Sequence, residues 1–306
     1  MPNQLFSPRQ VAARLGVSES SVKRWCDQGL VSVERTAGGH RRIPRYELTR
    51  LMEGSPIDGA SEQSNQYGES VSVSEEFRST VAGIMDALLC EDETFCWQLI
   101  TQQQVQGRAV SWICDQILAP AFHQIGDRWE RREVDIYQER SARCLGVRLL
   151  HRLRAQDRSV DSALLALGGS LEGDPYLVPI TMCDTVLTSV GWNSSLLGNS
   201  IPTDSIVNAI EKHRPLIFWV SVSCVDHEAG FISGFNQIAE AASQIGTVFI
   251  AGGRALTQPL RTRLRYAAFC DTMEQFDSLA TTLRKQLLNR SSLLSESGSA
   301  ATTVFG

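Results

Sequence analysis

The chain has 306 residues, of which 42% are hydrophobic and 21% are charged. This composition supplies apolar material for two or three packed domains and excludes a mainly disordered, collagen-like or disulfide-rich chain. The eight cysteines form no Cys-x-x-Cys pair, and no basic segment followed by an apolar one opens the chain. We therefore expect reduced thiols in a cytoplasmic protein with no membrane partner.

Charge is distributed unevenly along the chain. Residues 1–53 contain nine Lys and Arg residues against five Asp and Glu, a net charge of +4, whereas the rest of the chain carries −9. A basic segment on an acidic body is typical of a protein in which that segment alone meets a polyanion. Ordinary protein surfaces also carry an excess of this size, so charge alone does not decide for nucleic acid.

Two short helices are predicted near the N-terminus. Ser7 is a good N-cap, Pro8 suits the first helical position, and Gln10 completes a capping box. A second helix opens at Ser18 and ends at Gly29, so the pair forms a helix-turn-helix whose second helix enters the major groove of DNA. The outward residues of that helix, which we expect to contact DNA, are Ser20, Ser21, Lys23 and Arg24.

A β-hairpin is predicted to follow these helices. The apolar residues switch to a period of two at Val31 and Val33, and Gly38-Gly39 suits a tight turn. The hairpin makes a basic wing aimed at phosphate or at a minor groove, and its expected DNA contacts are Arg35, His40, Arg41 and Arg42. A small basic domain that binds protein is the alternative.

A Gly-, Ser- and Gln-rich linker is predicted at residues 54–72, followed by a four-helix bundle at residues 73–157. The apolar residues of the bundle region recur with the 3.6-residue period of amphipathic helices. Trp129 lies in the segment that joins the third and fourth helices, where it is either a core anchor or a functional residue. His123 and His151 stand alone in the sequence, so we interpret them as structural.

Strands and helices alternate in residues 158–288, which predicts a doubly wound, Rossmann-like α/β domain. Ligands of such domains bind beyond the carboxyl ends of the strands. The expected ends are residues 168–176, 197–201, 221–227 and 252–255. We find no dinucleotide fingerprint, Walker A loop or catalytic triad, and Asp226-His227-Glu228 is interpreted as a surface loop. Residues 289–306 are predicted to be disordered.

The stretch from Ser21 to Leu51, with its Gly-Gly-His-Arg-Arg wing, resembles the winged helix-turn-helix of the MerR family. Over about residues 5–288 the domain order resembles the cobalamin-dependent photoreceptor repressors of that family, the CarH/LitR type. The helical and α/β parts also resemble the cobalamin-binding region of methionine synthase. The supporting motifs are Leu197-Gly198-x-x-x-Pro202, Ser221-x-Ser223 and Gly252-Gly253-Arg254.

The resemblance implies a set of cobalamin-binding residues. In the family, the Ser after the third strand and the Gly-Gly after the fourth line the slot for the nucleotide tail of cobalamin, where glycine permits close approach of the backbone. The positions that match in this chain are Trp129, Glu139, Asp174, Tyr176, Ser221, Ser223, Gly252 and Gly253.

Two departures from the family bear on the cobalt. The family's Asp-x-His-x-x-Gly reads Asp174, Tyr176 and Pro179 here, and a phenol is a poorer cobalt ligand than the imidazole it replaces. In the bundle, Arg140 replaces the His that follows the matching Glu in the family. We therefore expect no metal ligand and no His-ligated cobalamin. Cobalamin with its own base on cobalt, another small molecule, and sensing through protein contacts alone stay open.

These features predict a DNA-binding transcriptional regulator of MerR type, with a cobalamin-binding-like module for sensing or oligomerisation. It would not be an enzyme, and its partner would be double-stranded DNA. A homo-oligomer, dimer or higher, would be needed to read paired half-sites. The alternatives are a corrinoid-binding subunit of a methyltransferase or mutase, and an adaptor that binds a partner regulator without a ligand.

Overall fold

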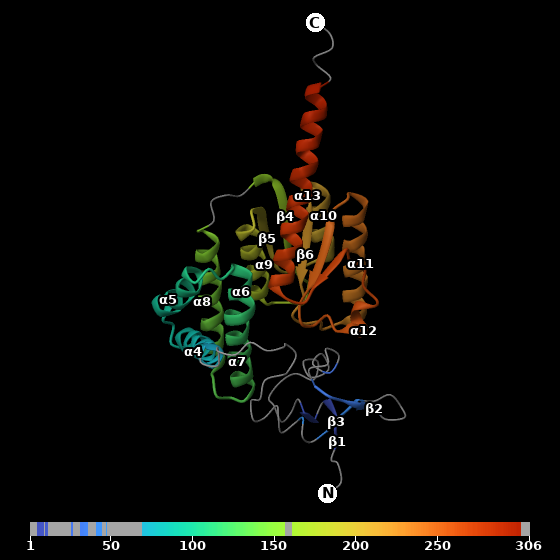
Figure 1. Cartoon of the computed structure of the whole chain (residues 1–306). Helices are drawn as coiled ribbons and strands as arrows, with labels where there is room; N and C mark the ends of the chain where they lie inside the picture. The colour runs from blue at the N-terminus through green and yellow to red at the C-terminus, as the bar shows by residue number, and fades with distance from the viewer. Residues whose placement is uncertain are drawn as a thin grey trace. The chain divides into compact units, whose positions relative to one another are not determined.

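The structure is a computed structural model that describes residues 5–8, 10–11, 26, 31–35, 41–44, 47, 69–156 and 161–300. The chain divides into two compact units, Met1–Gly68 and Glu69–Gly306. Figure 1 shows the helices and strands of both units.

The first unit contains a small antiparallel sheet with the strand order β1-β3-β2. Its strands are β1 (Leu5–Phe6), β2 (Glu34–Arg35) and β3 (Arg41–Pro44). Glu34 pairs with Arg42 and Arg35 with Arg41, so the strands of the predicted wing are confirmed. Among the expected DNA contacts, Ser20, Ser21, Lys23, Arg24 and His40 lie outside the described residues.

The predicted capping box at the start of the first helix is confirmed. The backbone N–H of Gln10 donates to Oγ of Ser7 over 3.3 Å, and the backbone N–H of Ser7 donates to Oε1 of Gln10 over 2.9 Å. The two side chains thus satisfy two N–H groups at this point of the chain.

The second unit begins with a helical part. Its elements are α4 (Glu69–Leu89), α5 (Glu93–Val105), α6 (Val110–Ile113), the π-helical turn η1 (Cys114–Leu118), α7 (Ala119–Glu130) and α8 (Ile136–Arg154). Because α6, η1 and α7 follow one another without a break, they form one continuous helical segment. With α4, α5 and α8, the helical part therefore has the four helical segments that were predicted. The linker prediction is wrong for residues 69–72, which are helical.

An α/β part follows, with a five-stranded parallel sheet in the order β5-β4-β6-β7-β8. The strands are β4 (Asp161–Leu171), β5 (Trp192–Ile201), β6 (Ile217–Ser221), β7 (Val248–Gly252) and β8 (Ala268–Cys270). The helices are α9 (Leu177–Ser189), α10 (Thr203–His213), α11 (Glu228–Gln244), α12 (Gln258–Arg261) and α13 (Met273–Ala300). The chain order reverses between β4 and β6, which is where ligands bind in doubly wound sheets.

Three predicted boundaries are wrong. β4 continues through Gly168 and Gly169 to Leu171, because both glycines pair with strands on either side of them. β5 runs to Ile201 rather than ending at Leu197. Residues 289–300 continue α13 instead of being disordered, since extending a helix adds a hydrogen bond per residue without a new nucleation step.

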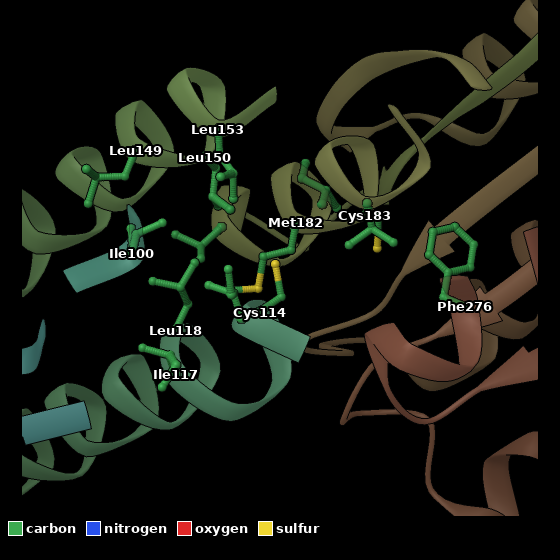
Figure 2. Close-up of a cluster of buried hydrophobic side chains, with 14 of the residues drawn as sticks. Ile100, Cys114, Ile117, Leu118, Leu149, Leu150, Leu153, Met182, Cys183 and Phe276 are labelled. Carbon is green, nitrogen blue, oxygen red and sulfur yellow. The ribbon is translucent and has the colours of Figure 1, made fainter. Parts of the chain in front are cut away.

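The two faces of the sheet support two hydrophobic clusters. Side chains alternate along each strand, so Phe218 and Val220 pack under α10 and α11 while Ile217 and Trp219 face α9 and α13. The cluster that contains Ile217 and Trp219 is continuous with the core of the helical part. Figure 2 shows Cys114 and Leu118 beside Met182 of α9, with Phe276 of α13 beyond Cys183. The helical and α/β parts therefore share one core.

Nowhere in the described part of the chain is there a helix with both the length and the apolar character that crossing a bilayer requires.

Candidate functional site

A cavity of about 740 Å³ lies between the helical part and the carboxyl ends of β4, β6 and β7. α7 and α8 supply one side, and the loop after β4 together with the ends of β6 and β7 supplies the other. Its volume is within the range of about 300–1,000 Å³ that small-molecule sites occupy. The cavity therefore has the size and the place in the fold of a ligand site.

Most of the cobalamin-site residues implied by the resemblance meet at this cavity. The side chains or backbone that line it include Trp129, Glu139, Tyr176, Ser221, Ser223, Gly252 and Gly253. Trp129 is 44% exposed, so it is not a core anchor but a ring at the cavity wall. The binding roles of these residues stay predictions.

Asp174, the remaining residue of that set, is 2% exposed and does not line the cavity. Its carboxylate accepts the backbone N–H of Tyr176 over 3.1 Å and that of Ser223 over 2.6 Å. Burial raises the pKa of Asp174, although these hydrogen bonds and Arg254 act in the opposite direction. Asp174 thus joins the loops that follow β4 and β6 and positions two residues of the cavity wall.

Tyr176 is covered by a cation from the helical part. The guanidinium of Arg143 on α8 lies 4.7 Å from the centroid of the Tyr176 ring and pairs with the carboxylate of Glu139 one turn earlier. Glu139 is 6% exposed, so its charge is largely removed from water and relies on Arg143. The contacts of Arg143 with Glu139 and with Tyr176 thus connect α8 to the loop after β4.

His123 on α7 also lines the cavity, although the sequence interpretation assigned it a structural role. Burial lowers its pKa, Arg254 lowers it further, and Asp127 acts in the opposite direction. The imidazole is therefore neutral at pH 7 and able to accept a hydrogen bond or a metal. No sequence pattern pointed to it, because the cavity that it lines forms only where α7 packs near segments as distant in the chain as the one that contains Arg254. His227, by contrast, caps α11 by accepting the backbone N–H of Gly230 over 3.0 Å.

The π-helical turn η1 joins the helical part to the end of the sheet. Asp115 in this turn accepts the backbone N–H of Met273 over 2.9 Å and that of Glu274 over 2.8 Å, at the start of α13. A carboxylate at a helix N-terminus satisfies donors that have no partner within the helix. Burial nevertheless raises the pKa of Asp115. Asp115 also lines the cavity, so this contact holds α13 against one side of it.

Trp219 of β6 and Ile250 of β7 form the sheet-side wall of the cavity. Trp219 is 1% exposed, and its ring packs edge-on against Phe276 of α13 with centroids 6.5 Å apart. A Cβ atom at Gly168 would lie 2.1 Å from Cδ2 of Trp219, so only glycine at that position admits the indole. Within the described residues, Nε1 of Trp219 has no hydrogen-bond partner.

Two of the thiols that line the cavity are largely buried. Burial is the main cause that raises the pKa of Cys183, and it raises that of Cys270 to about 11, so both stay protonated. In the described ranges, no group of three or more His, Cys, Asp or Glu side chains is arranged to hold a metal ion.

The residues present do not fit a cobalamin ligated from the loop after β4 with its nucleotide tail inserted beside the sheet. The phenol ring of Tyr176 lies under Arg143 at the position where the family has its imidazole. The indole of Trp219 narrows the space between β6 and α13, next to Ser221 and Gly252, where it packs against Phe276. The cavity does suit a ring system lying above the strand ends, since aromatic side chains, guanidinium groups and His123 surround that space.

Comparisons with known proteins agree with this architecture. Residues 5–56 match the family model of a helix-turn-helix domain, and residues 81–143 match that of a B12 binding domain. No curated protein sequence matches the chain.

Similar solved structures include three corrinoid-related proteins. The monomethylamine corrinoid protein of Methanosarcina barkeri is 16% identical, with a TM-score of 0.56 over 67% of this chain and 99% of that chain. A cobalamin-binding protein from Desulfitobacterium hafniense is 15% identical, with a TM-score of 0.35 over 66% and 97%. A methanol:cobalamin methyltransferase complex from M. barkeri is 13% identical, with a TM-score of 0.34 over 72% and 86%. The first of these shows that the helical and α/β parts share the fold of a corrinoid protein.

Proposed function

We propose that this chain is a DNA-binding transcriptional regulator whose second unit binds a small molecule in the cavity. The observation that carries the proposal is the helix-turn-helix match at residues 5–56, in a chain that also has a B12 binding domain match at residues 81–143. A corrinoid-binding subunit of a methyltransferase needs no DNA-binding segment, so the alternative accounts for less of the chain. In this proposal the protein is not an enzyme and acts in the cytoplasm.

DNA contact is assigned to the helix-turn-helix and to the wing. Arg41 and Arg42 lie on β3, and Arg42 is paired across the hairpin with Glu34. Guanidinium groups on a short hairpin suit contact with phosphate or with a minor groove. Reading two half-sites requires two copies of this unit, so we include a homodimer or higher oligomer in the proposal.

The ligand is assigned to the cavity without a cobalt–histidine bond from the loop after β4. Tyr176 replaces that imidazole, and Arg143 covers its ring. A ligand above the strand ends would contact α8 and the loop after β4 together, and would therefore change how Arg143 and Tyr176 pack. That contact is the proposed source of the signal.

The DNA assignment is tested by a gel shift of full-length protein on its promoter fragments across a salt series. Arg41→Ala with Arg42→Ala should weaken binding and lower the slope of log affinity against log salt by about one per lost phosphate contact. The matched control is Arg131→Ala with Arg132→Ala, which removes the same charge from the exposed turn after α7. Equal affinity and slope in the wing variant and in the wild type would contradict the proposal.

The domain boundaries are tested by limited proteolysis. We propose that residues 1–53 and the second unit are joined by a linker within residues 54–68, so the first cuts should release a stable fragment that begins near Glu69. A first cut inside α7 or α8 would contradict this division.

A further inference from the structure

We infer that Trp219 determines which ligands the cavity accepts, because its indole narrows the space between β6 and α13 and thereby excludes any ligand that must place a second ring there. The inference rests on the proposed ligand-binding role of the cavity and specifies its ligand. The ligand is a macrocycle, or a ring system of similar width, that lies above the strand ends and inserts no tail beside the sheet.

The position of Trp219 follows from strand alternation. Residues 217, 219 and 221 of β6 face the same side of the sheet, and Ile217 and Trp219 belong to the core shared with the helical part. Ser221 lines the cavity at the end of the strand, and Trp219 lines it one step deeper. A tail that passed over the paired strand ends at Ser221 and Gly252 and ran along this face would meet the indole first.

Packing contacts on two sides fix the position of the Trp219 indole. It packs on the bare backbone of Gly168 in β4 and meets the ring of Phe276 edge-on. Figure 2 shows Phe276 next to Cys183, at the end of the shared core. With Gly168 on one side and Phe276 on another, the ring cannot move toward either of them without repacking β4 or α13.

The hydrogen bonding of Trp219 suggests a role beyond packing. Its buried Nε1 has no partner among the described residues, and burying an N–H group without a partner is unfavourable. A phenylalanine would occupy part of the same space without that cost. The extra width of the indole is therefore consistent with a side chain that closes the gap rather than one that only stabilises the core.

The test compares one corrin ring with and without its tail. Methylcobalamin and methylcobinamide share the ring and the methyl group, but cobinamide lacks the nucleotide. Equilibrium dialysis of the full-length protein, read by corrin absorbance in dim light, gives an affinity for each. Trp219→Ala should bind methylcobalamin at least tenfold more tightly than the wild type does, while its affinity for methylcobinamide changes less than threefold. Wild-type protein should prefer methylcobinamide.

Two further variants keep the test decisive. Trp219→Leu leaves a smaller void and should show the same tail-dependent gain if Trp219→Ala melts below the assay temperature. Trp219→Phe fills only part of the space that the indole occupies, so it should show a smaller gain than Trp219→Ala or Trp219→Leu. Equal gains for both corrinoids, no gain for methylcobalamin in the Ala and Leu variants, or a wild-type preference for methylcobalamin would overturn the inference. A gel shift on the same samples is independent of this ratio, so failure of the proposed DNA binding is recognised separately.

Discussion

The two faces of the central sheet carry aromatic side chains of similar size but use them differently. Under α10 and α11, Phe218, Phe235 and Phe249 pack against one another with centroids 4.9–5.8 Å apart, and none of them lines the cavity. Under α9 and α13, Trp219 is as deeply buried but forms a wall of the cavity. One face thus contributes to stability alone, whereas the other combines the core with a binding surface.

The largest expected effect of a substitution is on the closed face. Phe235→Ala removes a fully buried ring from the cluster under α10 and α11 and should lower the free energy of unfolding by about 3–5 kcal/mol. Urea unfolding of the full chain measures the loss. Corrinoid affinity below the transition should equal that of the wild type, and a changed affinity would show that the two faces are coupled.

Gly168→Ala tests the open face by overfilling it. The added Cβ would lie 2.1 Å from Cδ2 and 2.3 Å from the backbone oxygen of Trp219, so we expect a loss of about 1–3 kcal/mol and altered ligand binding. Gly126→Ala is the matched control. It also replaces a glycine with alanine, in the helix α7, but the added Cβ atom has no other atom within 4 Å. Equal stability of the two variants would contradict the packing described for Trp219.

Arg143→Ala tests the connection between the helical part and the strand ends. The variant loses the stacking on Tyr176 and leaves the buried Glu139 without its partner, which should cost about 0.5–2 kcal/mol. Arg143→Lys keeps the charge but loses the planar group, so it should recover only part of the stability. Full recovery by lysine would show that stacking on Tyr176 contributes nothing measurable.

The smallest expected effect is the pH dependence from His123. Because its pKa in the folded protein is lowered below the ordinary 6.5, the unfolded chain binds the proton first as the pH falls through 6.5. The free energy of unfolding should therefore fall between pH 6.5 and the lowered pKa, with no contribution from His123 above that range. His123→Gln should remove this part of the slope in urea unfolding between pH 5 and 7.5, and an unchanged slope would contradict the burial described for the ring.

Local features of the chain were predictable because they depend on neighbours in sequence. The capping box of Ser7 and Gln10 is built from residues three apart, and the wing follows from a period of two around a glycine pair. Alternating strands and helices likewise predicted the doubly wound sheet, since parallel strands require crossover helices. The residues at which these helices and strands end were less predictable, as the extension of α13 through residues 289–300 shows.

The candidate site could be predicted only where a resemblance pointed to it, and its deeper parts could not. Trp219 and Gly168 are 51 positions apart, yet a bare backbone beneath an indole is what closes the space beside the sheet. His123, Arg143 and Asp115 acquired their roles when α7, α8 and η1 packed on the ends of the strands. The sequence by itself determined which elements form and which residue types follow each strand, through local hydrogen bonding and periodicity. Only tertiary packing decided which side chains face the cavity and how much room a ligand has, because both depend on contacts between distant segments.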